Sequence, residues 1–437
     1  MAMACQHPEG AFQLLPADLP PLGSPLRWPW LQRLRRGPLL DAEPWLQAVE
    51  RGALLPAADL LAVLAPQLDP PAQVRLLRWW RDQARVDPAL PAQVLSQRDP
   101  ASAAWLAAQL APGPAGLGSH LPQVVAEALL PLLGHQRQAQ TWPLLVAWLQ
   151  APIPAPLRRA ALEGVARGLP VWPRAALSTT LSTLAGDLDP RLAATAVDLL
   201  ARLAAPRGRL LPLRRRPLDP GVVQRIERRL AAMPAQPLLL VVHGRSGGEL
   251  PTELQRLAVE LERRRGAPVR LQALTACGPP PSASLLQPGQ GLTLVPLLLL
   301  PGGHVRHDLP VIVRHWRRLG TVRTVPFLGA WPCWQQALRR ELLGLGSEPL
   351  LLHHPLEGPL AARYLAHLEQ VCGARCLATP YSAEHLALLQ PTLSAPSLPL
   401  ALAANRLTDQ LADRVGPPLL QRPALRSLLL DQLEALP

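Results

Sequence analysis

From residue 237 onward, short and mostly apolar runs alternate with longer segments whose apolar residues recur at helical spacing. The wholly apolar run Pro237–Val242 precedes the amphipathic segment Pro251–Arg265, and the expected strand Val269–Leu274, which also contains Arg270 and Gln272, follows. Such runs are typical of strands buried on both faces of a parallel sheet. The alternation therefore predicts a βαβ series and an α/β fold for this part of the chain. The series continues with expected strands at Leu292–Leu300 and Thr321–Pro326 and expected helices at Val305–Leu319 and Pro332–Leu343.

After residue 345 the same pattern begins again as a shorter second copy. Three segments of the first copy recur in order: Pro237–Leu240 as Pro349–Leu352, Val295–Leu300 as Leu398–Ala403, and Pro326–Pro332 as Pro417–Pro423. The sequence therefore predicts two lobes with parallel sheets, at 235–345 and 346–437. Because α/β sheets bind ligands at the carboxyl ends of their strands, a cleft between the lobes is the natural ligand site.

The first half of the chain is predicted to be helical. Its apolar residues recur at helical spacing, and its prolines lie between these segments or in their first turns, where a missing N–H costs little. The expected helices are Pro71–Val86, Leu121–Leu133, Thr141–Gln150, Leu157–Leu169, Arg174–Leu188 and Arg191–Ala204. With the α/β half, they make the chain a multidomain protein.

An internal repeat of 35 residues runs through these helices. Two sets of positions share this spacing: Ala126, Ala161 and Ala196, and Leu130, Val165 and Leu200. A period of this length, made of two helices, is typical of stacked helical repeats. The segment resembles HEAT-like repeats. We predict an all-α, HEAT-like solenoid at 41–216, which would serve as a protein-interaction arm, after an N-terminal extension at 1–40.

The chain is strongly basic, and its positive charge comes from arginine alone. The sequence holds 44 basic residues and no lysine, against 31 acidic residues, for a net charge of +13. A GC-rich codon bias explains this usage, and an anionic partner such as nucleic acid, a membrane surface or a polycarboxylate is the functional alternative. Five arginines fall in Pro206–Pro217, which we expect to be a basic loop or linker. A phosphate-binding strip is the weaker reading of that segment, because no aromatic residues lie between the arginines.

Apolar runs and cysteines indicate the compartment. The longest apolar run, Leu292–Leu300, is interrupted by Pro296 and is far shorter than a membrane span. Met1–Gly10 has no basic region followed by a long apolar one, so we expect no signal peptide. Five scattered cysteines argue against a disulfide framework and favour the cytoplasm. Cys372 and Cys376 lack CxxC spacing, so structural thiols are favoured over a metal site.

Two histidines follow predicted strands, where α/β proteins build their sites. His243 lies in VVHGRSGG and His304 in PLLLLPGGHVRHD. Glycine pairs beside them, at 247–248 and 302–303, permit tight turns and the close approach of a ligand. A neutral imidazole can bind a divalent metal or accept a proton near pH 7. A phosphate loop is disfavoured because GxGxxG and GK[ST] are missing, and a serine hydrolase because Ser246 is in no GxSxG motif.

These residues resemble a known family. The run LVPLLLLPGGHVRHDLP (292–310) resembles the most distinctive segment of the sirohydrochlorin cobaltochelatases and ferrochelatases, the class II tetrapyrrole chelatases. Val241–Gly244 resembles the first histidine motif of that family, and PFLGAWP (326–332) its stretch before the closing helix. The C-terminal lobe is similar to that of the longer, two-lobed members. The resemblance covers about residues 235–437.

The resemblance implies a lyase of cobalamin or siroheme biosynthesis that inserts Co²⁺ or Fe²⁺ into sirohydrochlorin, an anionic tetrapyrrole. His243 and His304 would bind the metal and accept the pyrrole protons, since imidazole suits borderline divalent metals. The metal would be a substrate, and no organic cofactor is expected. Arginine forks suit the peripheral carboxylates. The expected substrate contacts are Arg245, Ser246, Gly302, Gly303 and Arg306.

The sequence also departs from the family pattern. Arg245 stands where the family has serine after His-Gly, and the segment Leu271–Cys277 lacks the acidic residue that members commonly carry after the second strand. The GPPPSAS segment that follows suggests a truncated helix. In the second lobe, simple alignment puts Pro355 opposite His243 and Arg406 or Leu407 opposite His304. A non-enzymatic tetrapyrrole or metal carrier, or an adaptor, is therefore the alternative function. A nucleic-acid partner is not favoured.

Overall fold

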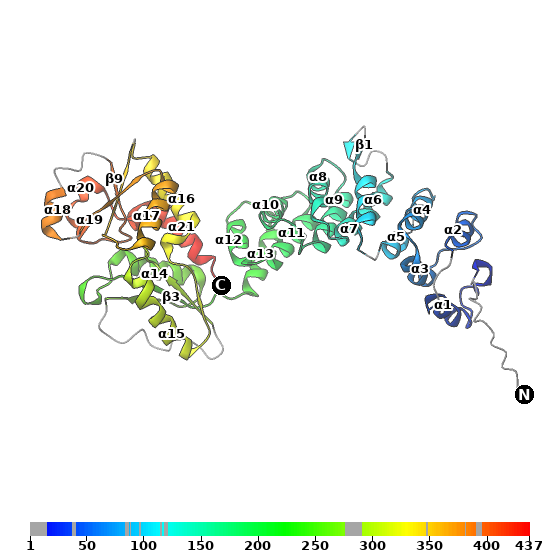
Figure 1. Ribbon diagram of the computed structural model, residues 1–437, viewed down its shortest axis with the longest axis horizontal. Coiled ribbons are helices and arrows are strands. Elements are labelled where there is room, and N and C mark those ends of the chain that lie inside the picture. Colours follow the sequence, from blue (N-terminus) through cyan, green and yellow to red (C-terminus); the bar gives the residue numbers. More distant parts are fainter. Residues whose placement is uncertain are drawn as a thin grey trace, which may run out of the picture. The chain divides into compact units, whose positions relative to one another are not determined.

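A computed structural model describes residues 15–36, 41–83, 87, 89–95, 98–113, 116–117, 121–275, 291–346, 348–380, 382–389 and 396–437. The chain divides into two compact units, whose elements are labelled in Figure 1. The N-terminal unit comprises Met1–Arg202 and Arg216–Ile226, and the C-terminal unit comprises Leu203–Arg215 and Glu227–Pro437. None of the helices in the described part of the chain is long and apolar enough to span a membrane.

The N-terminal unit is helical, as predicted, apart from the short antiparallel pair of β1 (Pro112–Gly113) and β2 (Gly116–Leu117). Two helices begin at an aspartate cap, because Asp69 accepts from the Ala72 N–H and Asp99 from the Ser102 N–H. The helical elements are η1 (Pro16–Asp18), α1 (Arg27–Arg36), α2 (Glu43–Glu50), α3 (Ala58–Leu64), η2 (Ala65–Gln67), α4 (Pro70–Arg81), α5 (Ala89–Val94), α6 (Pro100–Leu110), α7 (Gln123–His135), η3 (Ala139–Thr141), α8 (Trp142–Gln150), α9 (Ala155–Arg167), α10 (Arg174–Leu184) and α11 (Pro190–Arg202). α13 (Pro220–Ala231) crosses the division between the units.

The positions of the 35-residue repeat are buried where successive helices pack. α9 packs against both α7 and α11, and the six repeat positions on these helices are at most 1% exposed. At Gly134 of α7 a Cβ atom would overlap the carbonyl group of Gly164 in α9, so these two helices touch through their backbones. The small residues thus allow the close approach inferred from the sequence, while the HEAT-like assignment stays a prediction.

The described part of the predicted N-terminal extension, 1–40, is structured. α1 buries Leu31 and Leu34 and packs against α3. Arg27 of α1 also pairs with Asp59 of α3, with 2.6 Å between Nε and Oδ2. The residues of α1 therefore belong to the helical array.

The segment Pro206–Pro217 is mostly a helix, and the expectation of a loop or linker was wrong. α12 (Pro206–Arg214) lies in the C-terminal unit, although the predicted boundary placed it with the helical half. Two arginines at the end of this segment, Arg214 and Arg215, are paired with the last helix of the chain, α21 (Pro423–Glu434). Arg215 lies 2.5 Å from the Glu434 carboxylate, and Arg214 lies 3.3 Å from it. Partners more than 200 residues away gave no signal in the local sequence.

We expect the Arg214→Ala/Arg215→Ala double variant to lose about 2 kcal/mol of the unfolding free energy of the C-terminal unit. The reason is that Glu434 is 1% exposed and, of its described ion-pair partners, would keep only the more distant Arg264, at 3.6 Å. A buried carboxylate that loses its nearer partners is costly. Urea unfolding followed by circular dichroism measures the loss. Arg256→Ala, at an exposed position of α14 (Thr252–Arg265), is the control. A loss below about 0.5 kcal/mol, the size of an ordinary surface substitution, would contradict this account.

The C-terminal unit contains two parallel sheets, as the alternation of apolar runs predicted. The first has the order β4-β3-β5-β6 and the second the order β8-β7-β9. The strands are β3 (Leu238–Val242), β4 (Val269–Ala273), β5 (Leu292–Pro296), β6 (Val322–Thr324), β7 (Leu350–His353), β8 (Arg375–Ala378) and β9 (Ser397–Pro399). The remaining helical elements are η4 (Ser246–Gly248), η6 (His304–Asp308), α15 (Leu309–Leu319), η7 (Leu328–Ala330), α16 (Pro332–Leu343), α17 (Pro359–Cys372), α18 (Ala383–Leu389), α19 (Arg406–Gln410), α20 (Ala412–Val415) and η8 (Leu419–Gln421).

The two lobes have the same hydrogen-bond register around their central strands. In the first lobe the Leu297 N–H donates to the Val241 carbonyl, and in the second the Leu400 N–H donates to the Leu352 carbonyl, both at 2.8 Å. The repeated P-x-L-x-x-x-P segments form η7 and η8, each directly ahead of a closing helix. Three strands of the second lobe thus repeat the connectivity of the first as well as its sequence pattern, and the described sheet of the second lobe has no strand corresponding to β6.

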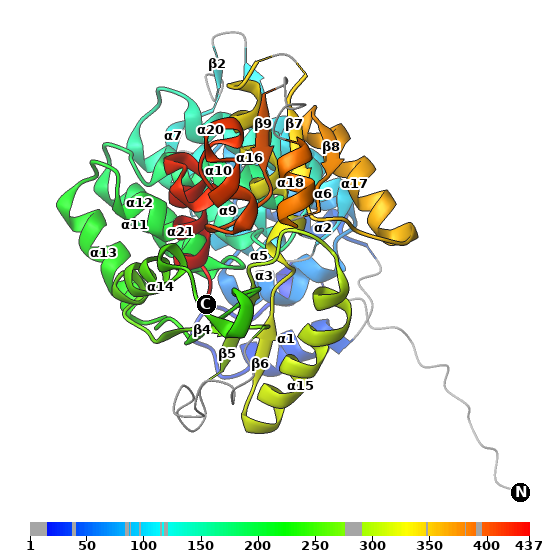
Figure 2. The ribbon, with the colours of Figure 1, turned by 90° about the vertical axis from the view of Figure 1, so that its left-hand side faces the viewer.

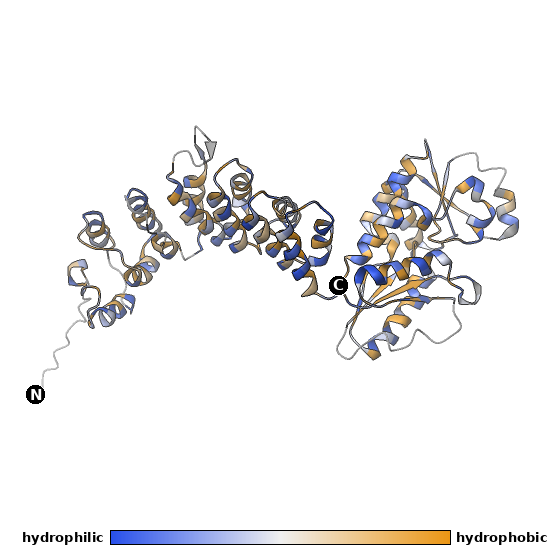
Figure 3. Cartoon of the chain, turned by 180° about the vertical axis from the view of Figure 1, so that it is seen from behind, coloured by the Kyte–Doolittle hydropathy of each residue, from blue (hydrophilic) through white to orange (hydrophobic). Residues whose placement is uncertain are grey.

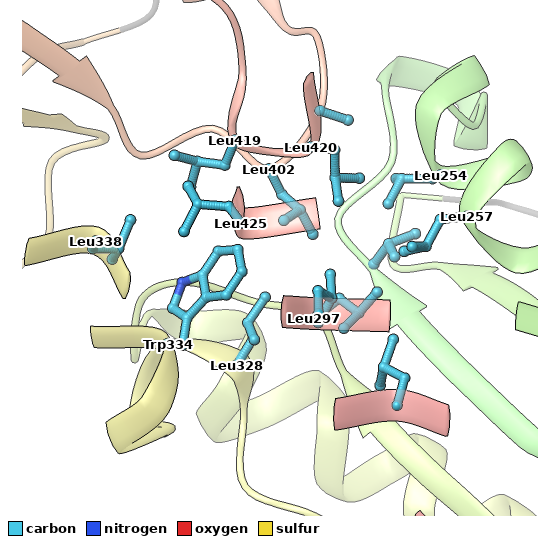
Figure 4. Close-up of a cluster of buried hydrophobic side chains, with 14 of the residues drawn as sticks. Leu254, Leu257, Leu297, Leu328, Trp334, Leu338, Leu402, Leu419, Leu420 and Leu425 are labelled. Carbon is cyan, nitrogen blue, oxygen red and sulfur yellow. The ribbon is translucent and has the colours of Figure 1, made fainter. Parts of the chain in front are cut away.

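Helices cover both faces of the first sheet. Alternate residues of β3 point to opposite sides: Leu239 and Val241 pack with Trp316 of α15, whereas Leu238 and Leu240 face α14. Figures 1 and 2 show α15 beside this sheet, and Figure 3 shows hydrophobic residues concentrated on the strands. On the face covered by α14, a buried cluster continues into the other lobe, where α21 packs against α14 and α16 (Figure 4). The lobes therefore share one hydrophobic core.

Candidate metal centre

Two imidazole rings meet at one end of the first sheet. His243 follows β3 and His304 begins the π-helix η6 after β5, so the pairing of β3 with β5 brings the two residues together. Their ring centroids are 4.8 Å apart and the rings are nearly perpendicular, at 81°. This separation is well within the width of a tetrapyrrole macrocycle. The structure thus places together the two histidines singled out from the sequence.

Hydrogen bonds orient both rings in the same sense. The Nδ1 atom of His243 lies 2.9 Å from the Gly244 carbonyl oxygen, and that of His304 lies 2.5 Å from Oδ2 of Asp308. Because a carbonyl and a carboxylate can only accept, each Nδ1 carries the proton in this arrangement. Nε2 of each neutral ring then keeps its lone pair for a metal ion or a proton.

The loop after His243 depends on a glycine and a threonine. Gly244 has φ of +78°, and a Cβ atom there would lie 2.6 Å from Oγ1 of Thr275. The Thr275 hydroxyl lies 3.0 Å from the His243 carbonyl and 2.7 Å from that of Arg245. Sequence reasoning missed Thr275, which lies in the segment where an acidic residue was sought. Only its place after a strand hinted at a role.

The helix that carries His304 differs from the predicted one. A regular helix was expected from Val305, whereas the structure has one π-helical turn, η6, ahead of α15. Wide turns of this kind occur often at functional sites. Within the turn, Asp308 is the side chain that reaches back to His304. Gly303 has φ of −52°, so glycine is not required there by backbone conformation, unlike Gly247 at +80°.

The predicted substrate-binding residues are in different surroundings. Arg306 is exposed, and no described residue pairs with it, whereas Arg245 reaches the second lobe, with Nη2 3.3 Å from the Ala404 carbonyl and 3.4 Å from Oδ2 of Asp409. Gly302 packs against Leu356, which a Cβ atom would meet at 3.4 Å, and Gly303 faces open space. Ser246 begins η4 in the loop after His243. Cys277 and the GPPPSAS segment lie outside the described residues.

The second lobe has only half of a matching histidine pair. The register that relates Val241 to Leu352, an offset of 111 residues, puts His354 opposite His243, where simple alignment had put Pro355. The same comparison relates Leu297 to Leu400, an offset of 103 residues, and so puts Leu407 opposite His304. Leu407 is fully buried. In the parts of the chain that the structure describes, no group of three or more His, Cys, Asp or Glu residues could hold a metal ion. The site is thus a pair of imidazoles on one lobe.

Burial makes the cysteines of the second lobe poor nucleophiles. It raises the pKa of Cys372 to about 11 and that of Cys376 to about 12, and neither forms a disulfide. Since the thiolate is the reactive form, we expect both to react with iodoacetamide at pH 7.5 roughly 100-fold more slowly in the folded protein than in urea. Peptide mass spectrometry measures the two rates. Equal rates in both conditions would contradict the structural role predicted for these thiols.

One comparison with known proteins covers the part of the chain that holds the two histidines. The CbiX family model matches residues 237–343, the stretch that holds both histidines, and supports a class II chelatase-like family for the C-terminal part of the chain. No curated protein matches significantly. The crystal structure of full-length LpoA from Haemophilus influenzae aligns over 89% of this chain and 78% of its own, with 14% identity. Its TM-score of 0.22 is too low to indicate a shared fold.

Proposed function

We propose that this protein is a chelatase that inserts Co²⁺ or Fe²⁺ into sirohydrochlorin. One observation carries the proposal: His243 and His304 are paired at 4.8 Å within the segment that the CbiX family model matches. Metal insertion needs a ligand set that delivers the ion along the ring normal and groups that take two pyrrole protons. Two imidazoles on one face of a macrocycle could supply both.

In this proposal the Nε2 atoms of the pair first hold the metal and then accept protons as the ion moves to the ring nitrogens. Asp308 assists the proton transfer. Its carboxylate contacts Nδ1 of His304 and would stabilise the imidazolium that forms when Nε2 accepts a proton. The Asp308 contact partly offsets the absence of an acidic residue at 271–277. The peripheral carboxylates of the substrate would be bound by arginine, and Arg306, with which no described residue pairs, is the candidate beside the site.

The carrier alternative is less well supported by the same geometry. Structural metal sites are normally closed by four protein ligands, whereas this pair offers two and lies at a partly exposed position, with 43% of the His304 side chain accessible. A two-ligand site favours release of the ion over storage. The described residues of the N-terminal unit include no comparable pair of histidine rings, and we propose that this unit binds a protein partner.

A metallation assay tests the proposal. Purified full-length protein, sirohydrochlorin and Co²⁺ or Fe²⁺ are mixed anaerobically, and the absorbance change of the macrocycle is followed against a protein-free reaction. We expect insertion at least 10-fold above the spontaneous rate with one of the two ions. A rate equal to the spontaneous one, with tight tetrapyrrole binding, would favour the carrier.

A further inference from the structure

The second lobe contacts the loops that carry both histidines, although it has no complete histidine pair. From the loop after His243, Arg245 donates to the Ala404 carbonyl and pairs with Asp409. These partners surround the start of α19, whose cap is Asn405. A half-exposed ion pair at 3.4 Å adds little to the free energy of unfolding. Its effect is local, because it holds the loop after His243 against the other lobe.

The loop before His304 is held more closely. Tyr364 of α17 has its hydroxyl 3.0 Å from the Leu299 carbonyl and 2.9 Å from the Gly329 carbonyl. Burial raises the pKa of Tyr364 well above its usual range, so the hydroxyl stays protonated and can donate. Gly329 leaves no space for a side chain, because a Cβ atom there would overlap the Leu299 carbonyl group.

Leu356 lies beside Gly302 in the same loop, where a Cβ atom added to the glycine would meet its side chain at 3.4 Å. The backbone from Leu299 to Gly302 therefore has a neighbour from the second lobe at each end. Two residues later the chain reaches His304. A displacement of about 1 Å at a reacting group can cost roughly 100-fold in rate, so contacts at this distance from the imidazole matter.

We propose that the second lobe is a positioning element for the imidazole pair, with Tyr364 fixing the loop before His304 and Asp409 fixing the loop after His243. The positioning of the two rings stands on the contacts alone, and only its effect on metal insertion rests on the proposed function. This positioning role gives the second lobe a function in the protein although Leu407 stands where the first lobe has His304.

Two conservative variants of the full chain test this role. Tyr364→Phe removes one hydroxyl and keeps the ring that packs on Phe327, and Asp409→Asn removes one charge. The matched control is Glu341→Gln, because Glu341 pairs with Arg422 across the lobes at 3.3 Å without touching either histidine loop. Hydrogen exchange at 243–249 and 298–308, the affinity for Co²⁺ alone and the kcat and KM for sirohydrochlorin are measured for each.

We expect Tyr364→Phe to speed exchange at 298–308 and Asp409→Asn to speed it at 243–249, with Co²⁺ affinity about 10-fold lower in each. kcat should fall by a similar factor while KM changes less than twofold. Glu341→Gln should leave all of these within twofold. The proposal is overturned if exchange and Co²⁺ affinity stay within twofold in both variants, or if the control loses as much. If the wild type binds Co²⁺ but inserts no metal, the proposed function fails, and the exchange and affinity data still decide the positioning role.

Discussion

Replacing His304 with alanine is expected to lower the rate of metal insertion at least ~100-fold while leaving tetrapyrrole affinity within about threefold. The His304 ring contributes one of two Nε2 atoms at the site, and removing a positioned acid–base group alone costs 10²–10⁴-fold in typical enzymes. His243→Ala should have a loss of the same order. The insertion rate of the double variant should be little lower than that of either single variant, because the effects of substituting residues that act as a unit do not add.

Two further variants show whether the loss is specific. Asp308→Asn keeps the side-chain shape but weakens the contact at Nδ1 of His304, so we expect a loss of roughly 10- to 100-fold, as for other groups behind a metal-binding histidine. His315→Ala removes an exposed histidine from the neighbouring helix α15 and should leave the rate unchanged. Absorbance-based insertion rates and tetrapyrrole fluorescence quenching measure both steps. More than half of the wild-type rate in His304→Ala would refute the role given to the pair.

Local sequence patterns were enough to locate the histidine site. Continuous apolar runs in the sequence indicate buried parallel strands, and the carboxyl ends of such strands lie at one edge of the sheet. His243 and His304 were therefore expected to lie close together. The bonding between β3 and β5 confirms that expectation. The 35-residue spacing likewise marked helix positions that prove to be buried.

Contacts between distant segments could not be predicted in this way. Tyr364 lies 65 residues from Leu299, and Arg245 lies 164 residues from Asp409, so no periodicity or spacing links them. Arg214 and Arg215 looked like part of a linker because the carboxylates that pair with them are on the last helix. The match of His354 to His243 was missed for a related reason: the lobes differ in length, and only hydrogen-bond register fixes the offset.

Trp334→Ala is expected to destabilise both lobes together, by about 3–5 kcal/mol, which is typical for removing a large aromatic side chain from a core. Trp334 is 1% exposed on α16 of the first lobe, in one cluster with Leu419 and Leu425 of the second (Figure 4). If the lobes share this core, the cavity weakens both sheets equally. The family match ends at residue 343, so an independent first lobe is the competing expectation.

Hydrogen exchange under native conditions separates the two expectations, since it reports the local unfolding free energy of each strand. In Trp334→Ala, protection should fall by the same amount at β3 in the first lobe and β7 in the second. Leu343→Ala removes a residue of the same helix that is 68% exposed, and it should change protection at neither strand by more than about 0.5 kcal/mol. Loss confined to β3 would mean that the lobes unfold separately. Equal loss would mean that the second lobe is required for the stability of the fold that brings His243 and His304 together, in addition to holding their loops.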